Sequence, residues 1–177
     1  MIPIKSERDL RIMRKSCEIA ANVLDEICRL AAPGVSTWEL DRAAKRIMEK
    51  HHCRSAEYKY KCGSLRYPGY VCISVNDQVI HGIGSKDRIL KDSDIVSFDC
   101  ATIFQGFVGD NTRTVYIGEP SPEVRRLVET TAEALNLGIE MARPGNRVGD
   151  ISAAIQRHVE SRGFGVVREF TGHGVGR

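Results

Sequence analysis

The sequence of 177 residues lacks the cysteine patterns that mark disulfide-rich proteins. Its six cysteines are scattered, and no two of them form a Cys-x-x-Cys pair. A chain of this length can bury enough apolar surface to fold without a disulfide framework. We therefore interpret the cysteines as free thiols in a reducing compartment.

The sequence also lacks a long basic block and a long apolar run. With 26 basic and 23 acidic residues the net charge is only +3, so no nucleic-acid-binding surface is indicated. No apolar run approaches the length of a membrane span. A charge appears as early as Lys5, so we expect no signal peptide. We expect a cytoplasmic protein with no specific nucleic-acid motif and no membrane segment.

The first fifty residues carry two helix-start signals. A capping box of Ser6 with Asp9 predicts a helix that runs to about Ala32. A second capping box begins at Ser36 and predicts a helix to about His52. Short strand-like segments follow at residues 56–60 and 69–75.

The chain repeats itself at an offset of 111 residues. The segment EIAANVLDEICRLAAPG, from Glu18, matches ETTAEALNLGIEMARPG, from Glu129, without gaps. We interpret the match as a duplicated helix-helix-strands unit within one domain, residues 1–177. The first copy spans about 7–118 and the second about 122–177. The second copy is expected to be truncated, since its counterpart of Asp99 would fall near position 210.

A β-hairpin is predicted around Gln105-Gly106. The flanking runs, Ile95 to Phe104 and Phe107 to Ile117, are rich in β-branched and aromatic residues and enclose a Gly-containing turn. With a loop of two residues, the residue numbers of any two cross-strand partners sum to 211.

Two aspartates lie on the predicted hairpin. In this register Asp99 is opposite Thr112 and Asp110 is opposite Ala101, so the two carboxylates share one face. As diagonal neighbours their Cβ atoms would be about 7 Å apart or less. Close carboxylates repel each other, and a divalent cation between them would remove that penalty. The alternative is that both aspartates mark the ends of the strands and point to water.

A histidine near the end of the sequence is a third candidate ligand. A strand is predicted over 166–170, and glycines at 172, 174 and 176 then surround His173. Imidazole together with carboxylates suits Mn, Fe, Co or Zn. A histidine in a mobile glycine-rich end is the alternative.

The motifs DIVSFDC…GFVGDNTRT, VIHGI and FTGHGVG, in this order and spacing, resemble those of type I methionine aminopeptidases. The resemblance covers the chain from end to end, with no N-terminal extension. It implies an α/β (α+β) pita-bread fold, the creatinase/aminopeptidase fold, in which two pseudo-repeated helix-helix-sheet halves enclose a dinuclear metal site. It also implies that Asp99, Asp110 and His173 bind two divalent metal ions, of Co, Mn, Fe or Zn.

The resemblance implies further site residues. His81 matches a histidine that contacts the scissile amide, and Tyr67 and Cys72 match positions of the pocket for the methionine side chain. Ser64 stands where many relatives carry an aromatic residue. A hydrogen-bonding role beside a turn is the alternative for His81, and a place in the core is the alternative for Cys72.

The implied function is metal-dependent removal of the N-terminal methionine from nascent proteins. Two glutamate ligands and a second histidine of the family would lie beyond Arg177, so activity of the 177-residue form is doubtful. The expected partners are nascent peptides and the ribosome, and the complete enzyme is expected to be a monomer, with self-association of the fragment. The alternatives are a non-catalytic pita-bread binding module, an Xaa-Pro aminopeptidase or prolidase relative, and a type II methionine aminopeptidase.

Overall fold

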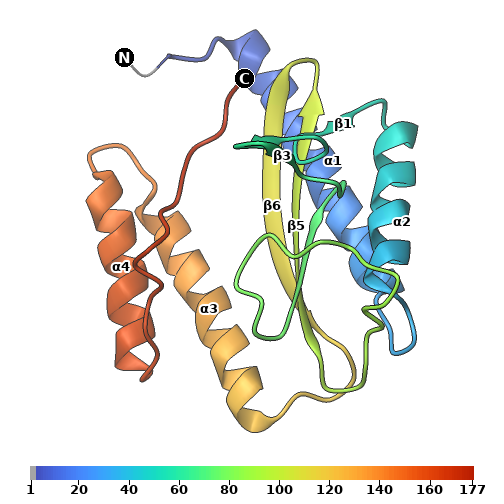
Figure 1. Ribbon diagram of the computed structural model, residues 1–177. Helices are drawn as coiled ribbons and strands as arrows, with labels where there is room; N and C mark the ends of the chain where they lie inside the picture. Colours follow the sequence, from blue (N-terminus) through green and yellow to red (C-terminus); the bar gives the residue numbers. More distant parts are fainter. Residues whose placement is uncertain (1–2) are drawn as a thin grey trace. The chain divides into compact units, whose positions relative to one another are not determined.

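The computed structural model describes residues 3–177, and for Cys62 the backbone alone. The chain divides into two compact units (Figure 1). The first consists of the residues up to Glu119 together with Gly174–Arg177, and the second of Pro120–His173.

Two helices of the first unit begin at the predicted capping boxes. In α1 (Glu7–Leu30) the Ser6 hydroxyl accepts a hydrogen bond from the Asp9 backbone N–H at 3.2 Å, and the Asp9 carboxylate accepts one from the Ser6 N–H at 3.1 Å. The same reciprocal pair of bonds opens α2 (Thr37–Lys50) at Ser36. Both predicted helix starts are confirmed, and both helices end about two residues earlier than predicted.

The strands of the first unit form two antiparallel sheets. The larger contains β1 (Arg54–Ser55), β4 (Cys72–Val75), β5 (Ile95–Phe104) and β6 (Phe107–Tyr116), and the smaller contains β2 (Lys61–Cys62) and β3 (Leu65–Arg66). β6 pairs with one edge of β5 along its whole length. β1 and β4 therefore share the other edge, each pairing with a different part of β5.

The predicted hairpin of β5 and β6 is confirmed. Gln105 and Gly106 both have positive φ, 48° and 84°, as a two-residue type I′ turn requires. This turn matches the right-handed twist of the two strands, so their pairing continues without a bulge over ten residues each.

The core lies between one face of the large sheet and the two helices. Figure 1 shows α1 running along the β5–β6 hairpin, with α2 beside it. Burial alternates along β5, where Val96, Phe98 and Cys100 point into the core. Further members of this core are Ile19, Val23, Leu24 and Ile27 of α1, and Leu40, Ala44, Ile47 and Met48 of α2. The opposite face of β5 presents the residues between them, including Asp99.

α1 comes into close contact with β6 at Ser16 and Gly109. The buried Ser16 hydroxyl donates to the Phe107 carbonyl at 3.0 Å, and the Thr102 hydroxyl donates to the Ser16 carbonyl at 3.0 Å. A Cβ atom on Gly109 would lie only 2.5 Å from the Cys17 backbone nitrogen. The residue before Asp110 is thus held directly against the helix.

The second unit contains a helix pair that repeats the helix pair of the first unit. α3 (Pro122–Met141) ends 111 residues after α1 ends, and both ends of α4 (Val148–Ser161) lie 111 residues after those of α2. The two helices pack on each other, and Gly138 of α3 lies against Ile155 of α4.

The predicted strand at residues 166–170 is wrong. This segment has neither helix nor strand structure. A strand needs a neighbour for its backbone hydrogen bonds, and the residues that the structure describes offer this segment no such partner.

No helix within residues 3–177 is long and apolar enough to cross a membrane. Five cysteines, Cys17, Cys28, Cys53, Cys72 and Cys100, are free thiols as predicted, while the side chain of Cys62 lies outside the described atoms.

Replacing Gly109 by alanine is expected to destabilise the first unit by about 1–3 kcal/mol, because the new methyl group overlaps the backbone of α1. Urea unfolding followed by circular dichroism measures the change. Gly149→Ala is the matched control, because a Cβ at that position of α4 meets no atom within 4 Å. Equal stability of the two variants would contradict the close approach of α1 to β6.

Candidate metal centre

The observed strand register brings Asp99 and Asp110 to one face of the sheet. Asp99 pairs with Thr112 and Asp110 with Ala101, as predicted. Partners across a strand pair share a face, so both carboxylates lie on the side away from α1. As diagonal neighbours their Cβ atoms are roughly 7–8 Å apart or less. Both side chains are half-buried, which makes an unpaired charge costly.

The Asp99 carboxylate is held in place from the neighbouring strand. The Thr112 hydroxyl donates a hydrogen bond to Asp99 Oδ1 at 2.6 Å. Hydrogen bonds of this kind orient the carboxylates that ligate metals in proteins. The arrangement fits an oxygen ligand for a divalent cation.

Cys72 and Tyr67 lie beside this pair. Cys72 of β4 is opposite Asp99, and it is buried without being part of the core beneath the helices. Burial, together with the negative charges of Asp99, Glu57 and Asp110, raises the pKa of the Cys72 thiol to about 12, although a hydrogen bond with Tyr67 opposes this shift. Cys72 is therefore an uncharged thiol near neutral pH.

The Tyr67 ring is fixed by its hydroxyl, which donates to the Gly82 carbonyl at 2.7 Å. Burial raises the pKa of this hydroxyl, and its contact with the Cys72 thiol adds to the shift. Ser64, by contrast, is exposed in the turn between β2 and β3.

His81 is exposed on the segment that follows β4. Its neighbour Gly82 donates to the Ser74 hydroxyl at 3.1 Å and accepts from the Ile73 N–H at 2.8 Å. A Cβ on Gly82 would lie 2.8 Å from the Ser74 Cα, so only glycine fits this position. His81 itself has a left-handed backbone with a φ of 58°. The tight contact at Gly82 therefore fixes the backbone position from which the His81 side chain extends.

Glu57 is a third carboxylate near the pair, and the sequence interpretation missed it. Its Oε1 accepts from the Ala101 N–H at 2.6 Å, and its Oε2 accepts from the Ser55 hydroxyl at 2.8 Å. Burial raises the pKa of Glu57 to about 7, and the charge of Asp99 contributes to the shift. The only sequence signal was an acidic residue within a strand-like segment, where β1 in fact ends at Ser55.

His173 belongs to the second unit and is exposed in a segment without helix or strand. Among the side chains that the structure describes, no three or more His, Cys, Asp or Glu residues form a group that could hold a metal ion. The first unit thus supplies a pair of carboxylates, and the role of His173 as a ligand stays a prediction.

Comparisons with known proteins bear on this carboxylate pair. Residues 11–177 match the sequence profile of metallopeptidase family M24. A methionine aminopeptidase of Aquifex aeolicus (strain VF5) is 42% identical over 178 residues, which cover 99% of this chain and 69% of that protein. The chain belongs to family M24 and, within it, to the methionine aminopeptidases.

Solved structures agree with this assignment. The crystal structure of methionine aminopeptidase from Rickettsia prowazekii matches the M24 chain with a TM-score of 0.94 at 38% identity, covering 99% of this chain and 69% of that one. The prolidase from Pyrococcus furiosus matches with a TM-score of 0.78 at 21% identity, over 92% of this chain and 45% of that one, which shows the shared fold alone. The M24 chain has the pita-bread α/β fold.

Family membership also settles the class of enzyme. The chain is a metalloaminopeptidase by homology, and M24 metallopeptidases depend on a divalent metal cofactor. A non-catalytic binding module and an Xaa-Pro aminopeptidase are not favoured.

The raised pKa of Glu57 predicts a pH-dependent stability. The folded chain binds this proton more tightly than the unfolded chain, whose glutamate titrates near 4.5. The stabilisation is complete below about pH 4.5 and is lost as the pH rises through about 7, so Glu57 alone lowers the free energy of unfolding of the metal-free chain by up to about 3 kcal/mol.

Glu57→Gln cannot titrate and should remove this part of the pH dependence. Urea unfolding of both proteins, from about pH 4 to about pH 8 in the presence of a chelator, measures the difference. Parallel stability profiles of the two proteins would contradict the raised pKa.

Proposed function

We propose that this chain hydrolyses the peptide bond after an N-terminal methionine, with Asp99 and Asp110 as ligands of the metal cofactor. The observation that carries the proposal is the β5–β6 register, which puts the two carboxylates on one sheet face. In a member of family M24, two half-buried carboxylates on one sheet face, of which Asp99 accepts a hydrogen bond from Thr112, are suited to bind a cation.

The proposed cofactor is a pair of divalent ions of Co, Mn, Fe or Zn, with His173 as a further ligand. When bound, such ions acidify a water molecule and polarise the carbonyl of the scissile bond. Carboxylate and imidazole side chains accept several of these metals, so availability selects among them. The chain's own contribution is to orient Asp99 through Thr112.

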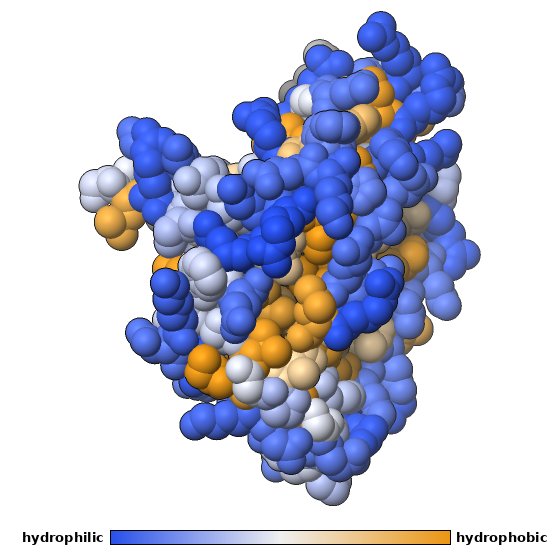
Figure 2. All heavy atoms as spheres, turned by 90° about the vertical axis from the view of Figure 1, so that its right-hand side faces the viewer, coloured by the Kyte–Doolittle hydropathy of each residue, from blue (hydrophilic) through white to orange (hydrophobic). Residues whose placement is uncertain are grey.

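His81 is proposed to contact the scissile amide and to assist the leaving group. An imidazole can hold or release a proton near neutral pH. Exposed apolar side chains flank it, with Val79, Ile80 and Ile83 exposed by 62%, 42% and 52%. Figure 2 shows that apolar side chains gather in a band on one otherwise hydrophilic face of the molecule. The exposed side chains of Val79, Ile80 and Ile83 beside this imidazole suit the binding of a peptide.

Tyr67 and Cys72 are proposed to line the pocket for the methionine side chain. An uncharged thiol and an aromatic ring edge are favourable surroundings for a thioether sulfur. The pKa of about 12 at Cys72 supports this use, because a thiolate would compete for the metal instead.

We further propose that the substrates are nascent chains on cytoplasmic ribosomes and that the enzyme acts as a monomer. The free thiols support a reducing compartment.

Asp99→Asn and Asp110→Asn are each expected to weaken Mn²⁺ binding by more than roughly a hundred-fold, since even the loss of an outer-shell partner costs 10–100-fold. Isothermal titration calorimetry measures the affinity. Asp94→Asn, just before β5, removes the same charge elsewhere and should bind Mn²⁺ like the unchanged chain. Equal weakening in all three variants would contradict the assignment.

His81→Ala is expected to lower the turnover of a Met-Gly peptide by roughly 10²–10⁴-fold with little change in Mn²⁺ affinity, because the imidazole transfers a proton rather than binds the metal. His51→Ala, at the end of α2, is the control and should retain turnover. Hydrolysis of Xaa-Pro peptides but not of Met-Gly peptides would overturn the proposed substrate.

A further inference from the structure

One edge of β5 has a gap between two partner strands. β1 pairs with residues 102–103 of β5, and β4 pairs with residues 96–99. Ala101 lies between them. Its carbonyl accepts from the Ala56 N–H at 2.8 Å, the last backbone bond from the β1 side.

The Glu57 side chain fills this gap. The Ala101 N–H, which would donate to a backbone carbonyl in a continuous ladder, donates instead to Glu57 Oε1 at 2.6 Å. The Ser55 hydroxyl donates to Oε2 at 2.8 Å and so holds the other oxygen of the carboxylate. A side chain therefore takes the place of a missing strand residue.

The backbone that Glu57 holds lies between the two aspartates. Ala101 is the cross-strand partner of Asp110 and follows Asp99 by two residues on the same face. A shift of Ala101 would change the spacing of both carboxylates at once.

We propose that Glu57 is a positioning residue of the metal centre, which fixes the separation of Asp99 and Asp110 through its hydrogen bond to Ala101. The proposal rests on the proposed function, because it assumes that the two aspartates bind a cation. In this proposal Glu57 acts on Ala101 rather than on the metal, and its two oxygens accept hydrogen bonds from the Ala101 N–H and the Ser55 hydroxyl.

The environment of Glu57 supports a positioning role rather than an incidental contact with Ala101. Burial and the charge of Asp99 both disfavour its ionised form. A carboxylate on the surface would avoid this cost, whereas the carboxylate of Glu57 is buried at the place where it can reach the Ala101 N–H.

Glutamine at this position can make both bonds without the charge, because its amide oxygen accepts from Ala101 and its amide nitrogen donates to the Ser55 oxygen. Glu57→Gln therefore separates the hydrogen bond from the charge.

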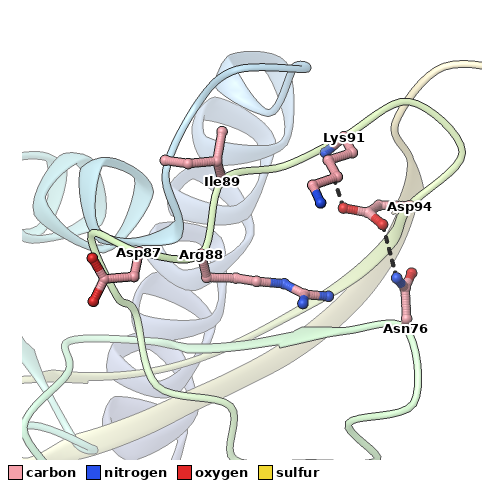
Figure 3. Close-up of a pocket in the computed structure, with 6 residues that line it drawn as sticks. All are labelled: Asn76, Asp87, Arg88, Ile89, Lys91 and Asp94. Carbon is pink, nitrogen blue, oxygen red and sulfur yellow. Dashed lines mark hydrogen bonds between the residues drawn. The ribbon is translucent and has the colours of Figure 1, made fainter.

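Asp94, the residue just before β5, provides a matched control. It lines a cavity of about 330 Å³ together with Asn76, Asp87, Arg88, Ile89 and Lys91 (Figure 3). Its carboxylate accepts from the Lys91 backbone N–H at 2.9 Å and from Asn76 Nδ2 at 2.8 Å, which parallels the one backbone and one side-chain donor at Glu57. Asp94 precedes Asp99 by five residues, roughly 16 Å along an extended strand.

The test compares Mn²⁺ affinities, measured by calorimetry at a temperature where every variant is folded. Glu57→Ala should bind Mn²⁺ roughly 10–100-fold more weakly than the unchanged chain, the usual cost of losing an outer-shell partner. Glu57→Gln should remain within roughly three-fold of the unchanged chain, since it keeps the hydrogen bond. Asp94→Ala should lose stability but keep its Mn²⁺ affinity.

Amide hydrogen exchange provides a second readout that needs no metal. The Ala101 N–H should exchange slowly in the unchanged chain, in Glu57→Gln and in Asp94→Ala, and should lose its protection in Glu57→Ala. Protection that persists in Glu57→Ala would overturn the proposal.

The affinities distinguish the remaining outcomes. Unchanged Mn²⁺ binding by Glu57→Ala would overturn the positioning role alone and leave the ligand assignment intact. Equal weakening by Glu57→Gln and Glu57→Ala would also overturn it, because the charge would then be responsible. Failure of the unchanged chain to bind Mn²⁺ would overturn the metal assignment and this proposal with it.

Discussion

The pairing of β5 with β6 across a turn of two residues is the constraint on which the first unit depends. Because side chains alternate along a strand, a slip of one residue would carry Asp110 from the polar face to the core beneath α1. The positive φ angles at Gln105 and Gly106 select a turn whose twist suits both strands. The close contact of Gly109 with α1 then holds the register from the other side of the sheet.

The two faces of β5 carry opposite kinds of chemistry. Toward the helices it presents Val96, Phe98 and Cys100, which contribute the hydrophobic stabilisation of the unit. Toward the other side it presents Asp99, near Asp110 and Glu57, so three carboxylates gather around one stretch of backbone. Their mutual repulsion is partly offset by hydrogen bonds from Thr112, Ser55 and the Ala101 amide. A bound cation would offset the rest.

Local patterns in the sequence were sufficient to predict the parts of the fold that depend on near neighbours. The capping boxes, the hairpin register and the offset of 111 residues between helix pairs are of this kind. Glu57 escaped prediction because its bond to Ala101 joins residues 44 apart in the sequence, and nothing near it signals the gap between β1 and β4. The strand predicted at 166–170 failed because residues that favour β structure do not by themselves provide a partner strand.

The separate pairing of β1 and β4 with β5 has a consequence for how this sheet can change in evolution. Each of the two short strands is aligned with β5 by its own contacts, and those of β1 extend to Ala56 and Glu57. The chain from Tyr58 to Val71 therefore leaves the sheet and returns to it without pairing with β5. Residues can be inserted into or deleted from the tip of this excursion, the β2–β3 turn, while the aspartates keep their places. The length of the loop next to Tyr67 can therefore change without disturbing the sheet. The two-residue turn between β5 and β6 cannot change in length in this way, because it sets the register of the two strands.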